Sequence, residues 1–84
     1  AEFRIFPNPF NPTTTIAFYF PQPCQVRMSI YALTGQLVAR PVDDHLASGT
    51  YQIPFDASGL ATGSYVCQLH VGQHALSRMM TIAK

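Results

Sequence analysis

The sequence has few charged residues and no tryptophan. Only 11% of its 84 residues are charged, against about 25% in an average globular domain. A phosphate-binding surface needs clustered cations, but the basic residues here are scattered, at Arg4, Arg27, Arg40, Arg78 and Lys84. We therefore exclude a nucleic-acid partner. The hydrophobic fraction of 48% also excludes a disordered chain, because disorder needs low hydrophobicity and high net charge.

Long apolar runs are missing as well. No run reaches the ~18 apolar residues of a transmembrane helix, and no signal-peptide pattern is present. The length suits a single domain, residues 1–84,. Because the chain begins at Ala1 rather than at a methionine, we expect it to be part of a larger secreted protein whose export signal lies upstream.

A sustained helical period is absent, and apolar and polar residues alternate instead. Seven prolines and five glycines separate the alternating segments. The pattern predicts strands at 14–20, 24–30, 37–41, 50–55, 65–71 and 75–83, with a seventh at 3–6. Pro54 predicts that its strand lies at a sheet edge, and the segment 43–49 is predicted to be a polar loop.

Short connections favour antiparallel pairing of neighbouring strands. Strands with one apolar face each close most simply as two packed sheets. The predicted fold class is therefore all-β, an antiparallel β-sandwich of about seven strands. A small barrel is the alternative.

Groups suited to catalysis or metal binding are sparse. The four acidic residues are not spaced as a glycosidase pair,. The three histidines, His45, His70 and His74, match no zinc-ligand spacing,. Asp43 and Asp44 alone offer too few oxygen ligands for calcium. We predict no catalytic residue, no metal site and no cofactor.

The two cysteines, Cys24 and Cys67, share the inward parity of their strands. An antiparallel pairing that places Cys24 beside Val71 leaves Cys67 roughly 13 Å away along the strand. That span exceeds the reach of a disulfide, so we predict two buried free thiols. His70 faces away from Cys67, which argues against a Cys–His nucleophile.

Outward aromatic residues leave a second function open. Tyr19 and Tyr31 face outward by parity, and sugar rings stack on exposed aromatic side chains. A carbohydrate-binding or purely structural accessory module of a secreted hydrolase, with polysaccharide as its partner, is therefore the alternative function. This alternative depends on analogy with other β-sandwiches.

One segment is highly specific. Residues 6–15, FPNPFNPTTT, closely resemble the YPNPFNPTTT opening of the C-terminal sorting domains of the type IX secretion system. Further parts of the family pattern follow in order over nearly the whole chain, at 16–21, 26–38, 46–51, 60–65 and 78–84. The segments 46–51 and 60–65 are both Leu-x-x-Gly-x-Tyr steps. The closing half is also similar to the Ig-like domain of flagellar hook-capping proteins.

The resemblance implies an Ig-like β-sandwich that acts as a non-catalytic sorting signal. Such a domain would direct an attached protein, the cargo, from the periplasm across the outer membrane to the cell surface. There the sorting domain is often cleaved off and the cargo is anchored. The implied partners are the type IX machinery, outer-membrane sorting and anchoring proteins, and the upstream cargo. The suggested recognition residues are Gly63, Tyr65, Arg78, Met80 and Lys84.

The segment called here the PNPFNP motif consists of Pro7, Asn8, Pro9, Phe10, Asn11 and Pro12. Its prolines restrict φ and bias the preceding residues to extended geometry. We expect Asn8 and Asn11 to cap the turns between the prolines, and Phe6 and Phe10 to anchor the motif on the sandwich. The last strand is predicted to close the core through Leu76, Met80 and Ile82 and to offer an edge for docking.

Overall fold

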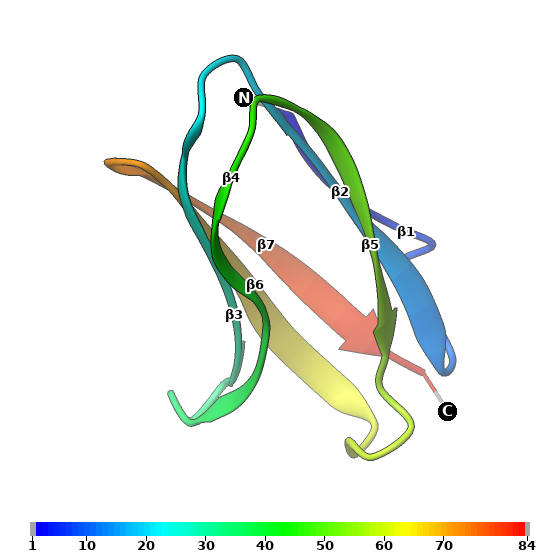
Figure 1. Ribbon diagram of the computed structural model, residues 1–84. Helices are drawn as coiled ribbons and strands as arrows, with labels where there is room; N and C mark the ends of the chain where they lie inside the picture. The colour runs from blue at the N-terminus through cyan, green and yellow to red at the C-terminus, as the bar shows by residue number, and fades with distance from the viewer. Residues whose placement is uncertain (1, 84) are drawn as a thin grey trace.

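Two antiparallel β-sheets pack face to face in the computed structural model, which describes residues 2–83 (Figure 1). The alternating segments of the sequence all become strands. The seven strands are β1 (Glu2–Phe6), β2 (Thr13–Phe20), β3 (Cys24–Ala32), β4 (Leu37–Leu46), β5 (Gly49–Asp56), β6 (Gly63–Val71) and β7 (His74–Ile82).

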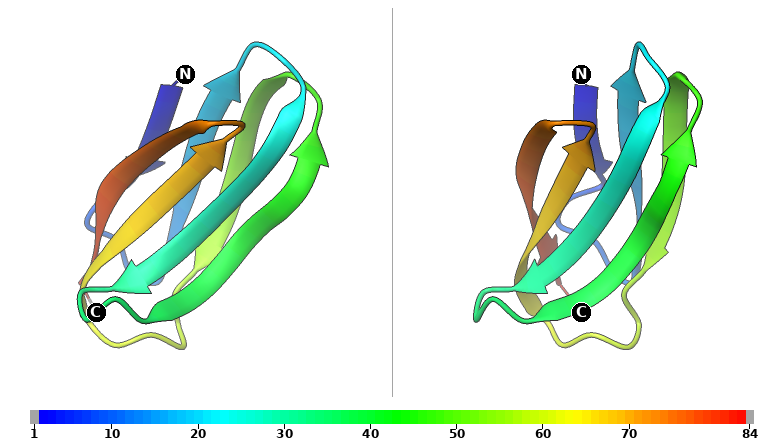
Figure 2. Two further views of the ribbon diagram at one scale, coloured as in Figure 1. Left: turned by 90° about the vertical axis from the view of Figure 1, so that its left-hand side faces the viewer. Right: turned by 60° about the vertical axis from the view of Figure 1, so that its left-hand side comes forward.

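The strand order is β1-β2-β5 in one sheet and β4-β3-β6-β7 in the other. Figure 2 shows the two layers, with three hairpins that each stay within one sheet. The connections from β2 to β3, from β4 to β5 and from β5 to β6 cross between the sheets. This arrangement confirms the predicted Ig-like sandwich and rules out the barrel. No helix in residues 2–83 is long and apolar enough to span a membrane.

The core lies between the sheets, where the alternation predicted it. Phe18 and Phe20 of β2 are 1% exposed, and Met28 and Ile30 of β3 are 0% exposed. The two phenylalanines stack on Tyr51 of β5, with ring centroids 5.4 and 5.6 Å away. Each fully buried side chain of this kind stabilises the fold by about 1.5–3 kcal/mol. The core is therefore aromatic on the β2–β5 side and aliphatic on the β3 side.

Strand β4 is longer than predicted. Residues 43–46, expected to be part of a polar loop, continue the strand to Leu46. Asp43 lies opposite Arg27, and their side chains form an ion pair at 3.5 Å. An antiparallel edge strand can expose one face to water, so its polar side chains lie outside while its backbone pairs with β3. Pairing with a neighbour has overridden the turn-like composition of this segment.

The register of β3 against β6 differs by two residues from the prediction. Val26, rather than Cys24, lies opposite Val71, and Cys67 lies opposite Ile30. A shift of two residues keeps every side chain on its predicted face, so Cys67 is still buried at 0% exposure. Both cysteines are free, which confirms the prediction of two free thiols. Cys24 is only half-buried, because it lies at the start of β3 rather than in its middle.

The two Leu-x-x-Gly-x-Tyr steps form the same local structure at the starts of β5 and β6. Their glycines, Gly49 and Gly63, have φ angles of 144° and 151°, a region that favours glycine. The hydroxyl of Tyr51 donates a hydrogen bond to the Ala47 carbonyl at 2.7 Å. In the second step, the Tyr65 hydroxyl likewise donates a hydrogen bond to the backbone carbonyl four residues upstream. Each step thereby fixes one crossing between the sheets.

Both strands on one side of the sandwich carry a proline. Pro54 lies in β5, which is an edge strand as predicted. Pro41 lies in β4, the edge strand of the other sheet. A proline has no N–H to offer a further strand, so it fits at an edge.

Candidate functional site

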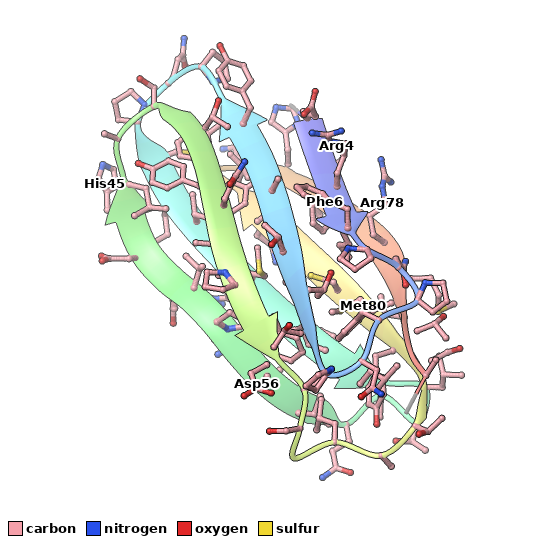
Figure 3. All side chains as sticks on the ribbon, turned by 90° about the vertical axis from the view of Figure 1, so that its right-hand side faces the viewer. Arg4, Phe6, His45, Asp56, Arg78 and Met80 are labelled. Carbon is pink, nitrogen blue, oxygen red and sulfur yellow. The ribbon has the colours of Figure 1, made fainter. Side chains whose placement is uncertain are left out.

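The PNPFNP motif connects β1 to β2 and lies along the outer edge of β7 (Figure 3). On this side of the sandwich β1 and β7 are the edge strands of their sheets. The motif therefore brings the first part of the chain against its last strand. This side of the fold holds the most specific sequence motif and the last strand together, and we treat it as the candidate site.

Asn8 pairs with β7 through both polar atoms of its side chain. Its Nδ2 donates to the Met79 carbonyl at 2.8 Å, and its Oδ1 accepts from the Thr81 N–H at 2.9 Å. One carboxamide thus takes the place of a neighbouring strand. The prediction that Asn8 caps a local turn is wrong, because its partners lie more than 70 residues away in sequence.

Phe10 continues this pairing with its backbone. Its N–H donates to the Thr81 carbonyl at 3.0 Å, and its carbonyl accepts from the Ala83 N–H at 2.9 Å. Its ring is 4% exposed and belongs to the core, which confirms it as an anchor. Phe6 is not an anchor: it is 41% exposed, because it points to the outer face of β1, where the Arg4 guanidinium lies 5.2 Å from its ring centroid.

Two prolines of the motif contribute through their carbonyl groups. The Pro7 carbonyl accepts a hydrogen bond from the Thr14 hydroxyl at 2.7 Å. The Pro12 carbonyl accepts from the Ala57 N–H, just after β5, at 2.9 Å. Since proline restricts φ, few conformations of the segment compete with the one that makes these bonds. The motif is therefore attached to β2, to the end of β5 and to β7 at once.

The suggested recognition residues do not form one surface. Tyr65 is 8% exposed and Met80 is 1% exposed, so both side chains belong to the core. Gly63 opens β6 with the positive φ described above. Lys84 lies outside the described residues. Within residues 2–83, Arg78 is the member of this set whose side chain reaches the solvent.

Arg78 lies beside a groove of about 340 Å³ between β1 and β7. Its guanidinium sits 5.7 Å from the ring centroid of Phe3, and Nη1 donates to the Ser77 carbonyl at 3.2 Å. Figure 3 shows Arg4, Phe6 and Arg78 on this one side of the molecule. The sequence offered no signal for the groove, because its two walls come from opposite ends of the chain. The groove is lined by Phe3, Arg4, Ile5, Phe6, Asn8, Arg78 and Met79.

The other polar candidates do not combine into a reactive site. Burial raises the pKa of the Cys67 thiol to about 12, because a buried thiolate loses its hydration. The reactive thiolate is therefore scarce at neutral pH. No three His, Cys, Asp or Glu side chains in the described chain are grouped as metal ligands. Of the two outward tyrosines, Tyr19 is 44% exposed and Tyr31 is half-buried.

Comparison with known proteins gives one finding. A family model described as "Secretion system C-terminal sorting domain" matches residues 4–83. The match includes the PNPFNP motif and reaches the end of β7. No curated protein and no solved structure matches the chain significantly.

Proposed function

The chain belongs to the family of secretion-system C-terminal sorting domains, and we propose that it delivers a covalently attached upstream protein to the cell surface. A domain of this family is a sorting signal for type IX secretion. In this proposal the attached protein passes through the periplasm, the type IX machinery moves it across the outer membrane, and outer-membrane sorting and anchoring proteins receive it. We assign no catalytic step to the domain.

One observation supports the proposal above all: the family model matches 4–83, nearly the whole domain, rather than one short motif. The fold is in keeping with such a role. The family's most specific segment, the PNPFNP motif, is hydrogen-bonded to the last strand of the chain. The motif thereby joins β1, the strand to which an upstream protein would connect, to β7, the last strand of the fold.

A reporter fusion tests the proposal. A fluorescent or enzymatic reporter with a signal peptide is joined upstream of residue 1 and expressed in a bacterium that has the type IX system. We expect the reporter at the cell surface or in the medium, and in the periplasm of an isogenic strain that lacks the system. A reporter that stays periplasmic in both strains would contradict the proposal. Binding of the purified domain to insoluble polysaccharide, together with that retention, would support the accessory module instead.

A further inference from the structure

We propose that the side of the sandwich formed by β1 and β7 docks an extended, acidic segment of a protein of the type IX machinery. In this arrangement the segment adds to the uncovered part of the β7 edge. The identity of the partner rests on the proposed function. The site itself follows from hydrogen-bonding groups, apolar surface and charge that the structure places together.

The edge of β7 is only partly occupied. Its register against β6 runs without a break, so the N–H and C=O groups of alternate residues point away from β6. At Thr81 these outward groups are bonded to Asn8 and Phe10. The same alternation points the backbone groups of Ala75 and Ser77, and the N–H of Met79, in this direction. Of these groups, the Ser77 carbonyl accepts a hydrogen bond from the Arg78 side chain. Within residues 2–83, no bond is seen to the others.

A row of unpaired backbone groups is a template for one more strand. The open stretch of β7, residues 75–79, is about as long as the part that the motif covers, residues 79–83, and a row of this kind suits a short extended segment rather than a helix. Asn8 and Phe10 occupy the neighbouring positions on the same edge, so an incoming strand would continue the row that the motif begins.

Apolar side chains flank the open edge. Met79 is 53% exposed and Phe6 is 41% exposed, and both line the groove between β1 and β7. Alternate side chains of a docked strand would point toward this groove. Burial of the two exposed side chains would add about 25 cal/mol for each Å² removed from water, a contribution that backbone pairing alone lacks.

The charge of the groove selects an acidic partner. Arg4 and Arg78 both line it. Arg4 has an ion pair with Glu2 at 3.3 Å, but both side chains are 64% exposed, so this pair contributes little. Among the described residues, no carboxylate lies within ion-pair distance of Arg78. A carboxylate on the incoming strand would therefore complete the groove as the partner of Arg78.

Charge also argues against a second copy of the domain as the occupant. Pairing of β7 with the β7 of another copy would bring two Arg78 side chains into one interface. Like charges across a strand pair are destabilising. An acidic segment of a different protein meets the same backbone groups without this repulsion.

Four variants of the reporter fusion test the docking surface. Ser77→Pro removes an outward N–H without removing a ladder hydrogen bond to β6. Its matched control is Gln52→Pro, at an exposed position of the opposite edge strand, β5. Arg78→Glu reverses the charge, and Arg78→Lys keeps it. We expect Ser77→Pro and Arg78→Glu to lower the exported reporter about tenfold or more, whereas Arg78→Lys and Gln52→Pro change it by less than about twofold.

Thermal unfolding of each purified fusion checks that the domain is folded, and Arg78→Glu keeps the test valid if Ser77→Pro destabilises it. Normal export of both Ser77→Pro and Arg78→Glu would overturn the docking surface while leaving the sorting function intact. Periplasmic retention of the wild-type fusion would instead contradict the sorting function, and with it the identity of the partner.

A photo-crosslink identifies the occupant. Met79 is replaced by p-benzoylphenylalanine in the fusion, and cells are irradiated during export. We expect an adduct with a protein of the type IX machinery, mapped to an extended segment that contains Asp or Glu and lost in the Arg78→Glu background. An adduct between two copies of the fusion, an adduct at a segment without acidic residues, or no adduct would overturn the proposal.

Discussion

The two open sides of this sandwich are closed in different ways. On the β4–β5 side, each edge strand contains a proline, and a short connection with a tyrosine hydroxyl bond joins the two strands. On the β1–β7 side neither strand contains a proline. There the edge of β7 is covered over part of its length by Asn8 and Phe10. The β4–β5 side is blocked by prolines, which lack a backbone N–H donor. The β1–β7 side is blocked by the PNPFNP motif, which supplies hydrogen-bond partners to part of β7.

The difference has a physical consequence. A proline blocks strand addition wherever it stands and needs no other part of the chain. The PNPFNP motif blocks only the groups that it bonds, and only while it is in place. The β1–β7 side can therefore combine protection near the end of β7 with an open stretch near its beginning.

Removal of the Phe10 ring should destabilise the β1–β7 side more than any other single change. Phe10→Ala deletes a core aromatic and the anchor of the motif, so we expect a loss of about 3–5 kcal/mol in the free energy of unfolding. The matched control is Phe6→Ala, which removes an exposed ring from the adjacent strand and should cost less than about 1 kcal/mol. Urea denaturation followed by circular dichroism measures both. Equal losses for the two variants would show that the motif is not anchored by Phe10.

Asn8→Ala should have the next largest effect. It removes two hydrogen bonds to β7, each worth about 1 kcal/mol, so we expect a loss of about 1–2 kcal/mol. Asn11→Ala is the control, because the Asn11 side chain is exposed and an exposed substitution changes stability by about 0.5 kcal/mol or less. Amide hydrogen exchange should also become faster at Thr81 in Asn8→Ala. Unchanged exchange there would contradict the pairing of Asn8 with β7.

Tyr51→Phe tests the opposite side with a smaller change. It removes the hydroxyl bond to Ala47 and keeps the ring that stacks on Phe18 and Phe20. We expect a loss of about 0.5–1.5 kcal/mol, with faster amide exchange confined to the connection between β4 and β5. Exchange that also changes at Thr81 would show that the two sides are coupled, against the view that each is closed independently.

Pro54→Thr should have the smallest effect on stability and a distinct effect on association. It adds an N–H to the β5 edge. We therefore expect the free energy of unfolding to change by about 0.5 kcal/mol or less, while self-association of the domain rises with protein concentration. Gln52→Thr on the same strand changes a side chain without adding a donor. Sedimentation velocity compares the two. If Pro54→Thr stays as monodisperse as Gln52→Thr, the proline is not what blocks this edge.

Much of the fold could be predicted because its signals are local. The alternation in β2, β3 and β6 shows directly which side chains enter the core, since strand side chains alternate with a period of two. Pro54 marked an edge strand, and the turn residues marked the hairpins. The extension of β4 through Asp43 was not predictable in this way, because its polar composition resembles a loop and the pairing partner lies on β3. The two-residue register shift between β3 and β6 was missed because it leaves parity unchanged.

The candidate site was only half visible in the sequence. The PNPFNP motif stood out, and the burial of Phe10 followed from its type. The role of Asn8 did not, because an asparagine between prolines predicts a local cap. The strand pattern correctly predicted that Met80 closes the core. Arg78 has the same parity as Met80, so parity alone did not predict that its side chain reaches the solvent,.

Four properties could be inferred from residue type and local pattern alone: the strands other than the extension of β4, their buried faces, the two free thiols and, through the PNPFNP motif, the family. These properties depend on side-chain type and on spacing within a few residues. The tertiary structure alone decided that the first loop covers the last strand, that β1 and β7 border one groove, and that Arg4 and Arg78 share it. The physical reason is that these contacts join residues some 70 positions apart, and which long-range pairs meet is settled by packing of the two sheets.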